Sequence, residues 1–587
     1  MKYKTEWDLT LLYKNEKDPQ IDKDVRTVEM LCGAFEKKYK GKDFISSSEK
    51  LHRALNDYEK LSKDELFKPW LYFFLLCDIH TDNQKAFAKK TSIEQRVSIA
   101  SNKVSFFVLE LAKINIKTQK KYLNDPKLKK FHYCLEQIFL NAKYNLGEKE
   151  EQLLNLLTQT SETMWVDLRQ KMLLQQTVIY DGEKIPFPKA KDLYSDLPKK
   201  KRHLLYKNIV ESAKSVSQIA EAELNALGNY RKVIDELRGY KMPYSASVLS
   251  KENTEEEIEE FTKLVTSYFH IAHRFYKLHA RLLKEKRLTF ADRRVQTGKI
   301  KKKFDFDTVL SISRNALRRA GQQYGDLLDE YITKGQIDVY PRKGKQSGGY
   351  QMAIGSLPTF ILLNFTESVQ IAETLTHEMG HAIHSKLSLG QPTIYQKYTT
   401  SVAEVASMFF EQFTGLELEN HLSEEERFIL LHRTLFEDMY GIFCQVACFN
   451  FETELHQQIR KQGQLSKEDM AKLLQKHMQA YCGPAIAITE DDGYLFVHWN
   501  HIRYYFYTYS YAYGGLISRT LFENWKHDHS YIKKVEQFLS AGKSMRPKDI
   551  FESIGIKTDK SFFDAGLKAI ENDVIKLEKL AKKLGKI

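Results

Sequence analysis

The chain has 587 residues, of which only 12 are proline and 27 are glycine, while 28% are charged and 42% are hydrophobic. This composition excludes a collagen-like protein, a low-complexity protein and a disulfide-stapled miniprotein, and it favours a large, mainly α-helical globular protein. The net charge of +13 is a modest excess over such a length, and we interpret it as a solvated basic surface.

Two short basic runs, 199–202 and 301–303, are the densest clusters of positive charge. They lie far apart and lack interleaved stacking aromatics, so we expect no nucleic-acid partner. The first 18 residues contain no apolar core of signal-peptide length, and no apolar run is long enough to span a bilayer. Six cysteines without a Cys-x-x-Cys pair fit a reducing compartment. We therefore expect a cytoplasmic protein with no membrane partner, and its oligomeric state stays open.

Helical periodicity dominates residues 1–175 and returns from about 200 to 330. Within the first region, the apolar run 70–77 predicts a buried helical segment of one or two turns. Breakers are rare in both regions, as expected for successive helices.

A hairpin is predicted at 177–185, because Asp181-Gly182 is a turn signal between two extended segments. The charged stretch that follows reads as a linker and contains three prolines: Pro186, Pro188 and Pro198. We therefore predict a domain boundary near residue 195, with an N-terminal helical domain at 1–195 and a second domain at 196–587.

The helical pattern is interrupted beyond residue 335. A glycine-rich loop at 344–349 resembles a phosphate-binding loop, but that motif needs a glycine at the position of Val339. The apolar and β-branched run 359–365 predicts a strand, and Pro358 near its start favours an edge strand. Thr366 is then expected to cap a helix that begins at the next residue.

Inside this helix lies His377-Glu378-Met379-Gly380-His381. Residues four apart share a helix face, so the two imidazoles can converge on one metal ion. Glu378 lies beside the first histidine, where its carboxylate can activate a zinc-bound water. An apolar stripe supports the helix: Ile371, Leu375, Met379, Ala382, Ile383 and Leu387.

A catalytic zinc site needs a third protein ligand. His384 points the same way as His377 but lies about 10 Å further along the helix axis, so one ion cannot use both. Glu404 is a better candidate, although Ser401 and Glu404 also match a helix capping box. Glu411 is either a rival ligand or a hydrogen-bond partner of a zinc-bound histidine.

Two other functions are weaker alternatives. A structural zinc site would usually have a fourth protein ligand, commonly cysteine, and none lies near the motif in sequence. A nucleic-acid-binding protein would carry a recognised module, which we do not find.

The motif and its surroundings resemble oligoendopeptidase F, the bacterial branch of the thimet oligopeptidase family of zinc metallopeptidases. The resemblance rests on residues 376–385 and 401–411, on Asp338-Val-Tyr-Pro-Arg342 and Ile361-Leu-Leu-Asn364 upstream, and on Trp499-x-His501 with the tyrosines after it. It is strong from about 335 to 515.

This resemblance implies that His377, His381 and Glu404 bind one Zn²⁺ per chain and that Glu378 is the catalytic carboxylate. It implies a mainly α, zincin-like fold with a small sheet near the active site and a deep channel between two helical halves. The function expected is a zinc-dependent endopeptidase that hydrolyses short oligopeptides. The strand at 359–365 would then hold the substrate as an added antiparallel strand.

The segment 498–513 is rich in tyrosine and carries candidate donors for the oxyanion that peptide hydrolysis creates. On one helix, His501, Tyr505 and Tyr509 would share a face. The resemblance favours His501 and Tyr509, with Tyr507 beside them. The family usually has Tyr-x-Pro where this chain has 503–505, so the substrate-facing tyrosine stays open. The competing interpretation is an aromatic core helix.

Overall fold

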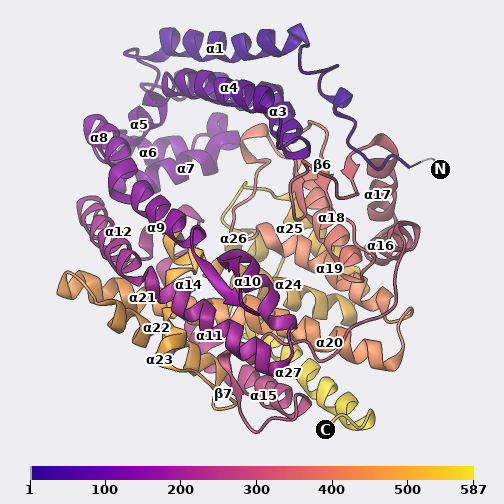
Figure 1. Ribbon diagram of the computed structural model, residues 1–587. Helices are drawn as coiled ribbons and strands as arrows, with labels where there is room; N and C mark the ends of the chain where they lie inside the picture. Colours follow the sequence, from indigo (N-terminus) through magenta and orange to yellow (C-terminus); the bar gives the residue numbers. More distant parts are fainter. Residues whose placement is uncertain (1–2) are drawn as a thin grey trace.

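The computed structural model describes residues 3–587 and consists mainly of α-helices, which confirms the predicted fold class (Figure 1). The first third of the chain forms α1 (Pro19–Tyr39), α2 (Ser48–Lys60), α3 (Lys68–Ile79), α4 (Gln84–Asn102), α5 (Phe106–Ala112), α6 (Ile116–Leu123), α7 (His132–Asn141), α8 (Glu148–Thr158) and α9 (Met164–Leu174).

These N-terminal helices bury three apolar clusters. One joins α1, α2, α5, α6 and α7, a second joins α1, α3 and α4 to the strand β6 (Phe360–Leu362), and a small third one lies between α1 and α4. The predicted buried segment at 70–77 lies within α3, which confirms it. In Figure 1 the start of the chain lies at the right, beside α17 (Gln322–Lys334). There the backbone N–H of Lys4 donates to the carbonyl of Ile332. The start of the chain is therefore tied to the region around the central sheet.

The predicted hairpin is confirmed as β1 (Thr177–Tyr180) paired with β2 (Glu183–Pro186). Asp181 and Gly182 both have positive φ, 49° and 84°, which a tight two-residue turn requires. The predicted linker is wrong, because α10 (Phe187–Leu193) follows at once. Pro186 and Pro188 are compatible with this helix, because backbone N–H groups at the start of a helix have no hydrogen-bond partner within it.

The rest of the chain is again helical. The helices of its middle part are α10, α11 (Lys199–Ser215), α12 (Ser217–Arg238), α13 (Ser245–Ser250), α14 (Glu255–Ser267), α15 (Phe269–Leu282), α16 (Phe306–Ala320) and α17. The last part forms α18 (Gln370–Ser388), α19 (Ala403–Leu418), α20 (Glu424–Asp438), α21 (Gln445–Gln462), α22 (Lys467–Cys482), α23 (Glu490–Gly493), α24 (Tyr509–His527), α25 (Ile532–Ser540), α26 (Pro547–Ser553) and α27 (Lys560–Lys583).

One large core runs through these helices, with buried members from Leu173 to Ala581. Cys444 and Cys448 belong to it as small buried residues with free thiols. Within residues 3–587, every helix is too short or too polar to cross a membrane.

Two small sheets lie in this part of the chain. β3 (Leu288–Thr289) pairs with β7 (Ile486–Ala487), and a three-stranded sheet has the order β4 (Ile337–Asp338), β6, β5 (Tyr350–Met352). The strand predicted at 359–365 is β6, but its assignment to the edge is wrong. Pro358 precedes the paired residues, so β6 can form backbone hydrogen bonds on both of its edges, to β4 and to β5. The exposed edge next to α18 is therefore the outer edge of β5.

The predicted helix after this strand is α18, although its predicted cap is wrong. The helix begins at Gln370, and the hydroxyl of Thr366 instead hydrogen-bonds that of Ser368. α18 lies against α19, and α24 also packs against α19. These three helices position the candidate site.

Candidate functional site

The motif residues His377 and His381 lie on one face of α18, with ring centroids 5.1 Å apart. α19 brings Glu404 to the same place: its Oε2 lies 3.4 Å from Nε2 of His377 and 3.6 Å from Nε2 of His381. Among the described residues, these three form the one group of histidine, cysteine and acidic side chains whose donor atoms all lie within 4.8 Å of one another. Two imidazole nitrogens and one carboxylate oxygen are a donor set typical of catalytic zinc.

Gly380 explains how the two helices come so close. A Cβ atom at this position would lie 2.6 Å from the Cα of Ser407 and 2.7 Å from the carbonyl oxygen of Ala406. A side chain here would therefore push α19, and Glu404 with it, away from the histidines. The buried hydroxyls of Thr376 and Thr414 hydrogen-bond across the same helix pair at 2.6 Å.

The two glutamates proposed from the sequence lie on opposite sides of His377. Glu404 faces Nε2, whereas Glu411 Oε2 lies 2.9 Å from Nδ1. This arrangement suits Glu404 as a metal ligand and Glu411 as an orienting partner of His377. The capping-box alternative is wrong, because α19 has Val402 as its N-cap and the Ser401 hydroxyl donates to the backbone carbonyl of Lys251.

Charge in this group favours a cation. Burial lowers the pKa of His377, but hydrogen bonds with Glu404 and Glu411 outweigh it and raise that pKa to about 10. Burial raises the pKa of Glu404, but His377 and His381 hold it down at about 2. Burial also lowers the pKa of His381 to about 4, which leaves a neutral imidazole. Two carboxylates thus surround the two imidazoles and hold a proton on His377, and a metal ion bound there would take the place of that proton.

His384 does not join this group. Its ring stacks on Tyr398 at 3.6 Å between centroids and is almost fully buried, as expected for a residue one helical step too far along α18. Burial lowers its pKa to about 3.

Glu378 directly follows His377 in α18, and it is 7% exposed. Burial raises its pKa to about 7. A carboxyl group with such a pKa can both accept and donate a proton near neutral pH. Its nearest backbone partner is Gln351 on the exposed edge of β5, so this edge faces the carboxylate.

The segment 494–508 is not one helix, so the predicted shared face of His501, Tyr505 and Tyr509 is wrong. It contains two short 3₁₀ turns, Tyr494–Val497 and Asn500–Arg503, and α24 begins only at Tyr509. The chain changes direction at Tyr505, which has a φ of 47°.

The structure brings His501 and Tyr507 together around Tyr511, with ring centroids 5.6 and 5.1 Å from the Tyr511 ring. Tyr511 lies one turn from Gly514, where a Cβ would lie 3.4 Å from the Cβ of Glu404, so this face of α24 is turned toward the metal ligands. Burial raises the pKa of Tyr511 and lowers that of His501, which leaves both groups neutral hydrogen-bond donors.

Tyr509 is placed elsewhere. It is fully buried against Phe449, and its hydroxyl donates to Asn253 Oδ1 at 3.2 Å. The sequence did not single out Tyr511, because only the observed start of α24 tells which of the alternating tyrosines faces α19.

A cavity of about 950 Å³ adjoins the exposed edge of β5. Its walls come from the N-terminal helices, from β5 and from the end of α18, and include Trp70, Val97, Gln351, Met352 and Ser385. A second cavity of about 500 Å³ reaches His377 and Glu411 from the side of α20 and α24. The second cavity thus reaches one of the candidate metal ligands, while the first lies at the sheet edge beside Glu378.

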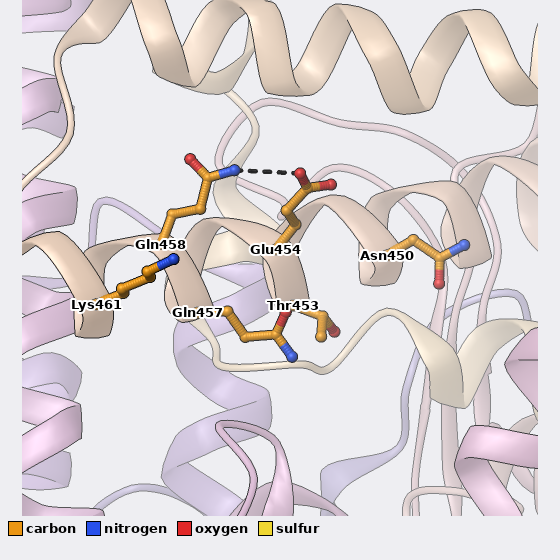
Figure 2. Close-up of a pocket in the computed structure, with 6 residues that line it drawn as sticks. All are labelled: Asn450, Thr453, Glu454, Gln457, Gln458 and Lys461. Atoms are coloured by element: carbon orange, nitrogen blue, oxygen red, sulfur yellow. Dashed lines mark hydrogen bonds between the residues drawn. The ribbon is translucent and has the colours of Figure 1, made fainter.

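A third hollow lies on one face of α21 and has only polar lining (Figure 2). Its one acidic group, Glu454, already accepts hydrogen bonds from Gln458, Lys476 and His477. The lining residues include no histidine or cysteine and are Asn450, Thr453, Glu454, Gln457, Gln458 and Lys461.

Comparisons with known proteins agree with the resemblance seen in the sequence. Residues 195–571 match the model of peptidase family M3, and residues 110–173 match the model named Oligopeptidase F. The chain is 25% identical to oligopeptidase PepF of Bacillus subtilis, over 93% of this chain and 83% of the relative. It is 24% identical to an oligoendopeptidase F homolog of Lactococcus lactis, over 99% and 98% of the two chains.

Solved structures share the fold. A peptidase from Chlamydophila abortus superposes with a TM-score of 0.87 at 21% identity, over 98% of both chains. Oligoendopeptidase-F from Enterococcus faecium gives a TM-score of 0.70 at 18% identity, over 96% of this chain and 99% of that one. The family model covers more than half of the chain and includes all the residues of the candidate site. The chain is therefore a member of peptidase family M3, with relatives of the oligoendopeptidase F type.

Proposed function

We propose that this peptidase is a zinc-dependent endopeptidase that hydrolyses short oligopeptides. The observation that carries the proposal is the convergence of His377, His381 and Glu404, with Glu378 beside them and a cavity at the neighbouring sheet edge. A structural zinc site is disfavoured, because the group has three donors where a closed site has four.

The residues fit a catalytic zinc ion. Nε2 of both histidines and a carboxylate oxygen of Glu404 would hold it, and Glu411 would fix the orientation of His377 through Nδ1. Zn²⁺ bound there supplies Lewis acidity, which polarises a carbonyl group and lowers the pKa of water toward 7.

Glu378 is the general base in this proposal. Its carboxylate takes a proton from the attacking water and later delivers that proton to the leaving amine. The pKa of about 7 that burial gives this group suits both steps near neutral pH.

Neutral donors from the 501–511 region would stabilise the oxyanion. His501, Tyr507 and Tyr511 form one cluster, and Tyr511 is on the face of α24 that approaches Glu404. We assign the main tyrosine donor to Tyr511, because the hydroxyl of Tyr509 is buried with Asn253 as its partner.

The substrate backbone would add to the exposed edge of β5 as an antiparallel strand. This edge faces Glu378, and the cavity beside it has room for an extended peptide. Recognition through backbone hydrogen bonds makes side-chain selectivity loose.

The test is hydrolysis of a mixed oligopeptide library, read by mass spectrometry. We expect internal cleavage of many peptides, loss of cleavage after treatment with a chelator, and recovery when Zn²⁺ is added back. Glu378→Gln protein is the matched control, because it should hold the metal and remain inactive. Cleavage that survives both chelation and this substitution would overturn the proposal.

A further inference from the structure

The backbone that carries His501 is held in a strained conformation. Tyr505 and Phe506 both have positive φ, 47° and 57°, although neither is glycine. Side-chain-bearing residues rarely adopt this region, and they stay there only when their surroundings hold them. Part of that support comes from Glu452, whose Oε1 accepts the backbone N–H of Phe506 at 2.7 Å.

A single buried carboxylate provides most of the remaining support. Glu223 on α12 is 0% exposed and accepts the guanidinium of Arg503, with Nη2 2.7 Å from its Oε2. Arg503 also donates Nη1 to the carbonyls of Phe496 and Trp499. The turn before His501 and the turn after it are thus tied to one side chain.

Glu223 also holds a second arginine. Nε of Arg169, on α9, lies 3.2 Å from Oε1 of Glu223, and this guanidinium is 1% exposed. Its Nη1 donates to Oδ1 of Asn500 at 3.0 Å, directly before His501 in the chain. From the same part of the chain, Glu162 accepts the hydroxyl of Tyr505 at 2.9 Å. Residues 500–505 are therefore held by hydrogen bonds from the N-terminal region and from α12.

We propose that Glu223 is a positioning residue for peptide hydrolysis: through Arg503 and Arg169 it sets the place of His501 beside Tyr511. This inference rests on the proposed function, since it gives His501 a role in the reaction. The physical reason is that removing a carboxylate and two guanidinium groups from water costs desolvation free energy, and such a cluster adds little net stability. Its benefit is then the fixed geometry that it gives to the 500–506 segment. A displacement of about 1 Å in an active site can lower the rate by about 10²-fold, so rigid support of this kind matters for catalysis.

The chain offers a close control on the same helix. Asp235 lies three turns further along α12, is 0% exposed and pairs with Arg231 and Arg460. Glu223→Gln and Asp235→Asn each remove the charge of a fully buried carboxylate that pairs with two arginines, although the arginines of Asp235 are about one-fifth exposed. We expect both to lower the melting temperature. Only Glu223→Gln should also lower kcat, by about tenfold or more, with zinc content and KM little changed.

The decisive measurement combines substitutions. If Glu223 acts through His501, then Glu223→Gln should lower kcat in the wild-type background but not in the His501→Ala background, where the group it positions is gone. The loss of melting temperature should be the same in both backgrounds. A loss of kcat that is equally large in both would show a merely structural role and overturn the inference.

A gentler variant covers the case in which Glu223→Gln does not fold. Asn500 is exposed, so Asn500→Ala should keep the fold while removing the link from Arg169. We expect a smaller fall in kcat that again disappears in the His501→Ala background. If His501→Ala lowers kcat while Glu223→Gln and Asn500→Ala leave it unchanged, the inference fails and the proposed function stands. If the wild-type protein cleaves no peptide, both fail.

Discussion

Glu411 Oε2 lies 2.9 Å from Nδ1 of His377, and Nε2 of the same ring faces Glu404 at 3.4 Å. One imidazole is therefore held between two carboxylates that lie two turns apart on α19 and are suited to different tasks. In the proposed zinc site, Glu411 would fix the tautomer and the ring plane of His377, while Glu404 would share the metal with Nε2.

The two glutamates should differ in their effect on zinc. Glu404→Ala removes a ligand, so we expect a largely empty site after dialysis against a weak chelator. Glu411→Ala should keep zinc but lower its affinity by about 10–100-fold, as expected for loss of an orienting partner. Elemental analysis and competition with a zinc indicator measure both. Glu419→Ala, just beyond the end of α19, is the control and should keep full zinc. Full occupancy in Glu404→Ala would transfer the ligand role to Glu411.

Glu378→Gln should separate metal binding from catalysis. The amide keeps the size of the side chain but cannot take a proton, so we expect about one zinc per chain and a fall in kcat of about 10³-fold or more. Glu373→Gln is a matched control on the same helix, because burial also raises the pKa of Glu373 to about 7 although its partner is Arg433. That control should lose stability and retain most of its activity. Substantial kcat in Glu378→Gln would disprove the assignment of the base.

Gly380→Ala tests the close approach of α18 and α19. The added methyl would meet the backbone of Ala406 and Ser407, which cannot rotate away. We expect a loss of about 1–3 kcal/mol in unfolding free energy and weaker zinc binding, because Glu404 moves with α19. Gly415→Ala on α19 is the control: a Cβ there meets nothing within 4 Å, so better helix propensity should raise stability by about 0.5–1 kcal/mol. Equal behaviour of the two variants in thermal unfolding would argue against helix spacing as the reason for this glycine.

Two tyrosines on the first turn of α24 should behave differently. Tyr511→Phe removes a donor from the face turned toward Glu404, and we expect kcat to fall by about 10²-fold with normal folding and zinc. Tyr509→Phe leaves Asn253 without its partner, so we expect a stability loss of about 1 kcal/mol and nearly unchanged kcat. Steady-state kinetics beside thermal unfolding checks both. If the kinetic effects are reversed, Tyr509 is the donor despite its burial.

Substrate length should limit the rate. The cavity beside β5 is closed on one side by α3 and α4, so an extended peptide can enter it but a bulky chain must first be threaded. We expect short peptides to be cleaved well and unfolded casein hardly at all, with kcat/KM measured on a ladder of peptides that share one cleavable core. Rapid degradation of casein would contradict a restricted entrance.

Local patterns predicted the parts of the site that are local. The spacing of His377 and His381 fixes their common face, because both lie on one helix. Glu404 stayed one of two candidates, since its place depends on how α19 packs against Gly380. The edge assignment of β6 failed for a related reason: its partners β4 and β5 are paired through contacts that no short window of sequence shows.

Tyr511 and Glu223 could not be identified from the sequence. Alternating tyrosines give no sign of where α24 begins, and a one-residue error in the start changes which ring faces α19. Glu223 sits in an ordinary amphipathic helix, about 280 residues before Arg503 in the chain. Only the folded arrangement reveals that it holds two arginines.

The packing of α18 against α19 has a consequence for the metal itself. The three donor atoms are brought together by apolar contacts, by Gly380 and by the Thr376–Thr414 hydrogen bond, and none of these depends on an ion. The site is thus preorganised, unlike a zinc finger, whose fold forms only when the metal binds. Zn²⁺ bound at the proposed site would then behave as an ordinary ligand of a finished fold: it could leave and return without unfolding of the chain, and its contribution to stability would rise with its free concentration.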